Sequence, residues 1–182
     1  HRDDPAQPVG VIVDALIEQQ RSGRIRHFGC SNWSVARIQA AQLHAASVAH
    51  EGFVACQPMW GLAEPDRDAM QQFAPGGYYE DGYRALHEAG LTMIPYSGQS
   101  RGVFTRLASG QEESIAADVK ALYLSDTNRR KLGVLRELAL KHNATVNAVV
   151  LAYLTSQPFL TIPIIGASSV AQLEQNLAAL EQ

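Results

Sequence analysis

The sequence has few cysteines, no excess of positive charge and no long hydrophobic run. Two cysteines, Cys30 and Cys56, are too few for a disulfide framework and lack the CxxC spacing of metal or redox motifs. We expect both to be buried, reduced thiols. The chain carries 15 Lys and Arg against 18 Asp and Glu, a formal net charge of -3. This balance argues against a nucleic acid partner, because binding phosphate backbones requires a basic surface.

No apolar stretch approaches the roughly 20 residues that cross a bilayer, and the first residues lack the layout of a signal peptide. We therefore expect no membrane partner and a cytoplasmic location. The chain starts without methionine in a polar turn, His1-Arg2-Asp3-Asp4-Pro5, which suggests a beginning cut from something longer. With 182 residues, of which 46% are hydrophobic, residues 1–182 are expected to form one domain or one portion of it.

Three familiar catalytic patterns are also missing. The sequence contains no G-x-G-x-x-G fingerprint, no HExxH metal motif and no Gly-x-Ser-x-Gly elbow. The histidines other than His1 follow no metal-ligand spacing, so packing or solvated roles are favoured for them. No metal is expected.

The hydrophobic pattern indicates short strands separated by helices. Helices are expected over residues 8–22, 34–48, 83–89, 128–142, 146–156 and 169–180, and strands over 25–30, 53–57, 91–96 and 160–165. Residues 61–82 and 97–125 are expected to be irregular. Strands that alternate with helices pair in parallel. Because the Gly-rich fingerprint of an open sheet is missing, a barrel segment is favoured, and barrels place their chemistry after the C-terminal ends of strands.

Amides, hydroxyls, small residues and one aromatic side chain follow the predicted strands. They occur at Ser31-Asn32, Gln57, Tyr96 to Gln99 and Gly166 to Ser169. Such groups can hydrogen-bond a carboxamide, stack on a flat ring and let backbone amides approach a phosphate. They suit a nicotinamide dinucleotide better than a metal. Ser and Asn are also ordinary turn and cap residues, so a purely structural role stays open for each one.

Five segments together resemble the second half of the aldo-keto reductase family over residues 1–182. They are His1-Arg2-x-Asp4, Gly29-x-Ser31-Asn32-Trp33, Gln57-Pro58, Ile94-Pro95-Tyr96-Ser97 and the stretch from Ile162 to Asn176. The resemblance implies an α/β fold, namely a partial TIM-type (β/α)8 barrel that comprises approximately strands five to eight with their helices.

The resemblance also implies a site for NADP or NAD. Ser31, Asn32 and Gln57 would hold the nicotinamide carboxamide, and Tyr96 would stack on the ring. Ser97, Gln99 and Arg101 would lie along the pyrophosphate. The adenosine end would meet Gly166, Ser168, Gln172, Gln175 and Asn176. Gly166 and Gln172 stand where the family often carries a Lys and an Arg for the 2′-phosphate of NADP, and Ser169 with Gln172 is also spaced as a capping box.

For catalysis, the resemblance implies reduction of aldehydes or ketones to alcohols by hydride transfer from NAD(P)H. Only the carbonyl-orienting histidine has a counterpart, His1, and the family's Asp, Tyr and Lys would lie upstream. The chain alone is therefore expected to be inactive. It would be completed by the missing N-terminal half or by self-association, because half a barrel leaves open strand edges. Two alternatives remain: a non-catalytic, cofactor-binding regulatory module, and an inactive truncated product.

Overall fold

The computed structural model describes residues 1–73, 78–79 and 81–179. The chain divides into two compact units, the first made of His1–Met59 and Ala74–Ile94 and the second of Trp60–Phe73 and Pro95–Gln182. Each unit is described in turn.

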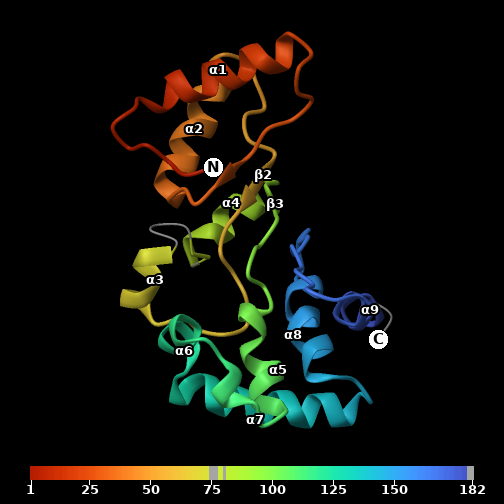
Figure 1. Ribbon diagram of the computed structural model, residues 1–182. Coiled ribbons are helices and arrows are strands. Elements are labelled where there is room, and N and C mark those ends of the chain that lie inside the picture. Colours follow the sequence, from red (N-terminus) through yellow and green to blue (C-terminus); the bar gives the residue numbers. More distant parts are fainter. Residues whose placement is uncertain (74–77, 80, 180–182) are drawn as a thin grey trace. The chain divides into compact units, whose positions relative to one another are not determined.

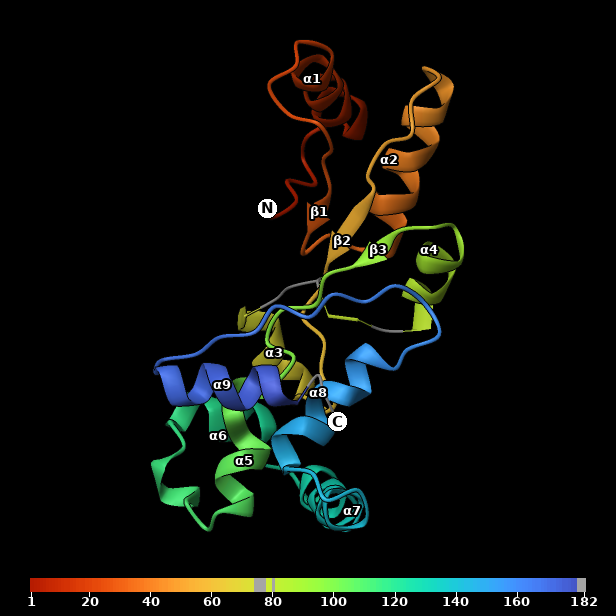
Figure 2. The same cartoon turned by 90° about the vertical axis from the view of Figure 1, so that its right-hand side faces the viewer.

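The first unit contains a parallel sheet of three short strands, β1 (Cys30–Ser31), β2 (Ala55–Gln57) and β3 (Thr92–Met93), in the order β1-β2-β3. Helices α1 (Val9–Arg21), α2 (Val35–Ser47) and α4 (Arg84–Glu88) accompany the sheet, and a 3-10 turn, η1 (Asp81–Tyr83), precedes α4. Figure 1 and Figure 2 show α4 beside β3. The parallel pairing confirms the predicted pairing of the first three strands. β2 and β3 are shorter than expected, and β1 overlaps the strand expected over 25–30 only at Cys30.

Local sequence explains the helices and the close strand spacing of this unit. Ser34 caps α2 by accepting a hydrogen bond from the backbone N–H of Arg37 at 3.4 Å, and the face of α2 made by Ile38, Ala41 and Ala45 is buried. A β-carbon on Gly29 would stand 2.4 Å from the carbonyl oxygen of Ala55. Glycine is therefore required where the chain enters β1, because any side chain would push β2 away.

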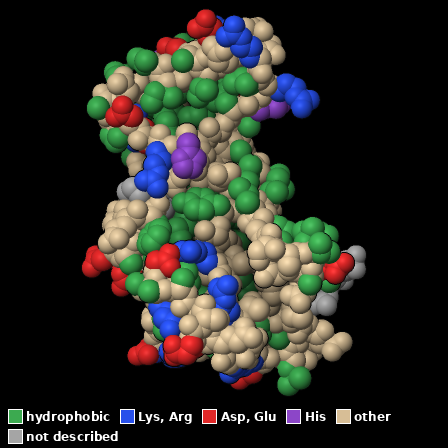
Figure 3. All heavy atoms as spheres, in the orientation of Figure 1, with side chains coloured by type: hydrophobic (Ala, Val, Ile, Leu, Met, Phe, Trp, Pro, Cys, Tyr) green, Lys and Arg blue, Asp and Glu red, His purple; other side chains and the backbone are tan. Residues whose placement is uncertain are grey.

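The second unit is helical. Its elements are α3 (Arg67–Phe73), the 3-10 turns η2 (Ser100–Gly102) and η3 (Glu112–Ser114), α5 (Val103–Ala108), α6 (Ala117–Tyr123), α7 (Asp126–Lys141), α8 (Val146–Thr155) and α9 (Val170–Ala178). Phe104, Leu122 and Leu154 are among its fully buried side chains. Acidic and basic side chains lie intermingled over α3, α6 and α7 in Figure 3, as the Arg129–Glu112 and Lys131–Glu64 ion pairs illustrate.

Buried Asn128 ties two loops of this unit together. Its Nδ2 donates to the carbonyl oxygens of Glu64 and Tyr123, both at 2.8 Å, and its Oδ1 accepts from the N–H of Glu64 at 2.9 Å. A fully buried amide is tolerated because these bonds replace the ones it would make with water.

Two stretches predicted to be irregular contain helices, which corrects the sequence reading. Residues 61–82 include α3, while residues 74–77 and 80 of that stretch lie outside the described residues. Residues 97–125 include α5 and α6. These helices span only six or seven residues, which is too short for a periodic pattern to reveal.

The fourth predicted strand, residues 160–165, does not join a hydrogen-bonded ladder. It runs extended and donates one bond, from Ile164 N–H to the carbonyl oxygen of Pro95 at 2.8 Å. Pro163 and Pro95 carry no N–H, which removes donors on both sides of this pairing. Along the segment, Leu160, Ile162 and Ile164 are 63%, 51% and 44% exposed, so the alternate side chains that a sheet would bury are open. Among the described residues, no helix is both long and apolar enough to cross a membrane.

Candidate functional site

In the first unit, the C-terminal ends of β1 and β2 bring three of the predicted residues together. Ser31 and Gln57 face each other in the parallel register. The Ser31 hydroxyl donates to the Gln57 carbonyl oxygen at 3.0 Å and accepts from Asn32 Nδ2 at 3.0 Å. Asn32 adopts a φ of 57°, a left-handed conformation that lets its short side chain turn back onto Ser31. The Gln57 side-chain amide is half-buried and makes no hydrogen bond to the described residues.

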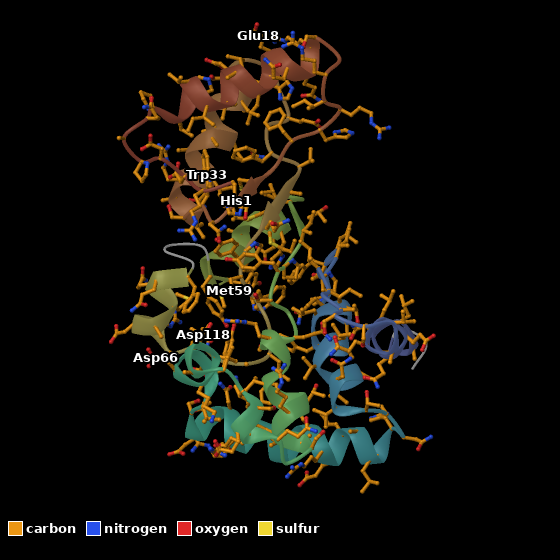
Figure 4. The ribbon with its side chains drawn as sticks, viewed as in Figure 1. His1, Glu18, Trp33, Met59, Asp66 and Asp118 are labelled. Atoms are coloured by element: carbon orange, nitrogen blue, oxygen red, sulfur yellow. The ribbon has the colours of Figure 1, made fainter. Side chains whose placement is uncertain are left out.

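His1 lies on the same unit and is exposed (Figure 4). The turn that follows it is fixed to α2, because the Arg37 guanidinium binds both carboxylate oxygens of Asp3, at 2.8 and 2.9 Å. The hydrogen bond to Asp3 raises the pKa of Arg37. The same guanidinium lies 5.4 Å from the ring centre of Trp33. These contacts bind the start of the chain to the segment that carries Ser31 and Asn32.

In the second unit, the segment from Ser97 to Gly102 has an unusual backbone. Ser97, Ser100, Arg101 and Gly102 all have positive φ, of 56°, 49°, 53° and 79°. Side-chain-bearing residues avoid this region, and such strain concentrates at functional sites. Two N–H groups of this segment bond within it, because Ser100 donates to the Ser97 carbonyl oxygen at 2.7 Å and Gly102 donates to that of Gln99 at 2.8 Å. Ser100 adds a second irregularity, because its buried hydroxyl has no hydrogen-bond partner among the described residues.

Arg101 is already engaged. Its guanidinium forms an ion pair with Asp118 of α6, and both side chains are nearly half-exposed. The hydrogen bond from Arg101 lowers the pKa of Asp118. Tyr96 precedes this segment and is half-buried, with its carbonyl oxygen accepting from the N–H of Trp60 at 3.3 Å.

An amide cluster joins three elements of the second unit. Gln99 Nε2 donates to Asn147 Oδ1 and to Asn176 Oδ1, both at 2.7 Å, and Asn147 Nδ2 donates to Asn176 Oδ1 at 2.9 Å. Asn176 Nδ2 reaches the carbonyl oxygen of Gly166 at 3.4 Å. The sequence pointed to Gln99, Gly166 and Asn176 but missed Asn147, which belongs to no motif and stands where a helix surface residue is expected.

The start of α9 uses the remaining predicted residues for its own structure. Gln172 N–H donates to the hydroxyl of Ser169, the N-cap, at 3.2 Å. Gln172 Oε1 accepts from both the N–H and the hydroxyl of Ser168, at 2.8 and 2.9 Å. The capping interaction suggested by the sequence is thus present, with Ser168 as the partner of the Gln172 side chain. Gln175 is exposed on the same helix.

The predicted residues therefore fall into two groups, one in each unit. Ser31, Asn32 and Gln57 lie in the first unit, as does His1. Tyr96 and all later ones lie in the second unit. Within the described part of the chain, no group of three or more His, Cys, Asp or Glu side chains is placed to hold a metal ion.

Comparison with known proteins gives one family. The sequence profile of the Aldo/keto reductase family matches residues 1–182. An aldo-keto reductase of Fusarium vanettenii is 29% identical over 99% of this chain and 46% of its own length. Aldo-keto reductase str7 of Strobilurus tenacellus is 26% identical over 98% of this chain and 51% of its own length.

A solved structure agrees on the fold. The crystal structure of a thermostable aldo-keto reductase, Tm1743, in complex with the inhibitor epalrestat superposes with a TM-score of 0.65 at 24% identity. The match covers 100% of this chain and 53% of the solved chain. The chain thus spans about half the length of the relatives it matches.

Proposed function

Because this chain belongs to the aldo/keto reductase family, we propose that it forms approximately strands five to eight of a (β/α)8 barrel. The complete protein reduces aldehydes or ketones to alcohols with a nicotinamide dinucleotide in the cytoplasm. The observation that carries this proposal is the hydrogen-bonded group of Ser31, Asn32 and Gln57 at the ends of two neighbouring parallel strands. In such barrels, strand ends are where the chemistry is placed.

The nicotinamide end of the cofactor would bind at Ser31, Asn32 and Gln57. A carboxamide presents one acceptor and two donors, and the Gln57 amide, which has no hydrogen bond to the described residues, offers the complementary set. Ser31 orients Asn32 by accepting from its Nδ2. The bound cofactor supplies the hydride, and these residues would set which atoms of the ring face the substrate. Tyr96 would complete the orientation by stacking on the ring.

The phosphates would be held by the segment from Ser97 to Gly102. Its left-handed residues support this role, because strained backbone of this kind concentrates at functional sites. Arg101 contributes positive charge from the same segment, partly offset by Asp118. The unpartnered Ser100 hydroxyl supports the same role, since packing alone does not explain a buried polar atom without a bond.

The adenosine end would meet Gly166, Ser168, Gln172, Gln175 and Asn176. Residues 160–179 contain no Lys or Arg. The side-chain oxygen of Gln172, Oε1, already accepts two hydrogen bonds from Ser168. A 2′-phosphate would therefore meet no Lys or Arg there. On this ground NAD is the better fit than NADP.

The proton donor would come from outside this chain. Buried Tyr83 uses its hydroxyl to donate to the Trp33 carbonyl oxygen at 2.9 Å, which is a packing role. We assign to His1 the role of orienting the substrate carbonyl. The proton would come from a tyrosine of the upstream half, which that half's Lys and Asp would assist. The exposed apolar row of Leu160, Ile162 and Ile164 supports completion of the barrel by further strands, from that half or from a second copy.

Cofactor binding tests this proposal directly. NADH fluorescence is titrated with the 182-residue chain and with the Gln57→Ala variant, and Gln111→Ala is the matched control on an exposed loop. We expect binding by the chain, about tenfold weaker binding by Gln57→Ala, and no change in the control. Equal affinity of all three proteins would remove Gln57 from the site, and absence of NADH binding would overturn the proposal.

The same cofactor-loaded chain separates the proposed reductase from its alternatives. Carbonyl reduction is measured after adding the upstream half-barrel of the same gene. NADH oxidation on addition of an aromatic aldehyde is the expected result. Binding of NADH without turnover in the completed protein would instead identify a regulatory module.

A further inference from the structure

The two cysteines of the chain stand side by side in the sheet of the first unit. Cys30 of β1 and Cys56 of β2 are register partners in a parallel ladder, so both side chains lie on the same face of the sheet. The Cys30 thiol lies 4.0 Å from the carbonyl oxygen of Ala55, the residue before Cys56, and therefore leans toward β2. Both cysteines are buried and free. The proposed reductase chemistry uses neither of them, although they directly precede Ser31 and Gln57.

The spacing of the two strands suits a disulfide. Neighbouring strands lie about 4.8 Å apart, and disulfides join cysteines whose α-carbons are roughly 4.4 to 6.8 Å apart. Gly29 keeps the strands close at this point, because a β-carbon there would collide with the carbonyl oxygen of Ala55. An S–S bond between Cys30 and Cys56 therefore requires rotation of the side chains and little movement of the backbone.

The ladder that such a bond would reinforce is short. β1 has only two residues, and its register with β2 consists of the pairs Cys30 with Cys56 and Ser31 with Gln57. An S–S bond would join one of these two pairs and close the loop of chain that contains α2. Closing a loop restricts the unfolded chain, and this restriction stabilises the folded state.

The reduced pair is the resting form. The hydrogen bond with Cys56, together with burial, raises the pKa of the Cys30 thiol and keeps it protonated at neutral pH. A protonated thiol is a poor nucleophile, so oxidation is slow and requires sustained exposure to an oxidant. Such behaviour is typical of cysteine pairs that sense oxidants in a reducing compartment, where permanent structural disulfides are rare.

We propose that Cys30 and Cys56 form a redox-sensitive clasp, in which a peroxide joins them in a disulfide that holds β1 against β2 and a thiol reductant reopens it. Cys30 is 7% exposed and Cys56 is 0% exposed, so hydrogen peroxide meets Cys30 first.

The oxidation proceeds in two steps. The Cys30 sulfur attacks the peroxide, the O–O bond breaks, and a sulfenic acid and one water form. The Cys56 sulfur then displaces the hydroxyl group from the Cys30 sulfur, which forms the S–S bond, and the thiol proton of Cys56 leaves with that hydroxyl as a second water. The two sulfurs together lose two electrons, which the peroxide gains.

Thiol counting tests the clasp, because the chain has no other cysteine. The 182-residue chain is treated with hydrogen peroxide, unfolded and labelled with a maleimide, and its mass is measured with and without dithiothreitol. We expect both thiols to be lost together within a single chain and to return on reduction. Cys30→Ala and Cys56→Ala are the matched controls, since each keeps one thiol and cannot form the internal bond.

Thermal stability is the second measurement. The oxidised chain should unfold at a midpoint about 5 °C or more above that of the reduced chain, and reduction should restore the lower value. The same treatment should leave the midpoints of the two single variants within about 2 °C. Peroxide also oxidises methionine, but it does so in the variants as well, so the difference between the proteins isolates the cross-link.

Two free thiols after prolonged peroxide treatment would overturn the inference, as would thiol loss that dithiothreitol does not reverse or disulfides found only between chains. A disulfide that forms within the chain but lowers the unfolding midpoint would mean that the strands must distort to accommodate it, and the clasp would be rejected. None of these measurements involves a cofactor, so NADH binding by the reduced chain tests the proposed function separately.

Discussion

Cys30 and Cys56 face each other across β1 and β2 at the same register position, and both are buried, free thiols. The hydrogen bond to Cys56, together with burial, raises the pKa of the Cys30 thiol far above its usual range. The sequence predicted buried, reduced cysteines, and the structure confirms this. Neighbouring strands bring them together because parallel pairing aligns residues 26 positions apart.

This pair predicts that stability falls at alkaline pH. The folded chain keeps Cys30 protonated where the unfolded chain releases the proton, so the folded state binds more protons. The free energy of unfolding should therefore fall as pH rises above about 8.5, by up to roughly 1.4 kcal/mol per pH unit. Urea unfolding at pH 7 to 10 under reducing conditions measures the slope. Cys30→Ala should flatten it, and an unchanged slope in that variant would contradict the assignment.

Ser100 predicts a stabilising substitution. Its φ of 49° strains any residue except glycine, and its buried hydroxyl lacks a partner. Ser100→Gly removes both costs and should raise the free energy of unfolding by about 1 to 2 kcal/mol. Ser100→Ala removes only the hydroxyl and should give the smaller gain. Denaturant titration compares the two, and a destabilised Ala variant would show that the hydroxyl does have a stabilising partner.

The buried hydrogen bonds of Asn128 predict a large loss of stability when this residue is substituted. Asn128→Leu would leave the N–H of Glu64 and the carbonyl oxygens of Glu64 and Tyr123 without their partner. The free energy of unfolding should fall by about 3 kcal/mol, because a buried polar group without a partner bears its full desolvation cost. Gln111→Ala, on an exposed loop, serves as the control in the same urea titration and should change stability by less than about 0.5 kcal/mol. A loss of similar size in both would mean that the network is not what stabilises these loops.

The apolar row predicts how the isolated chain behaves in solution. Ile162 is 51% exposed between Leu160 and Ile164, so Ile162→Lys places a charge in the middle of the row without disturbing the core. Self-association measured by light scattering should decrease, because a charge in the middle of an exposed apolar row opposes its burial against a second chain. The unfolding midpoint should not change. Persistent association in the variant would locate the contact elsewhere on the chain.

Much of the fold could be predicted from local sequence. The periodic apolar faces of α1 and α2 and the caps at Ser34 and Ser169 are short-range features, so the helices formed where expected. Strand-end residues could be recognised for a similar reason, since Ser31 ends the buried strand β1 and Asn32 follows it directly. In contrast, the strand expected over 160–165 would need a neighbouring strand to pair with, and the local sequence does not specify one. Pro163 also lacks the backbone N–H that such pairing would use.

The sequence by itself determined the family resemblance, the alternation of helices and strands, and the residue types of the candidate site. These depend on neighbours within a few positions. The tertiary structure alone decided that Gln99, Asn147 and Asn176 form one hydrogen-bonded unit, that Gln172 bonds Ser168, and that Arg101 pairs with Asp118. Amide orientation depends on partners as far as 77 residues away, and such contacts exist only once helices have packed.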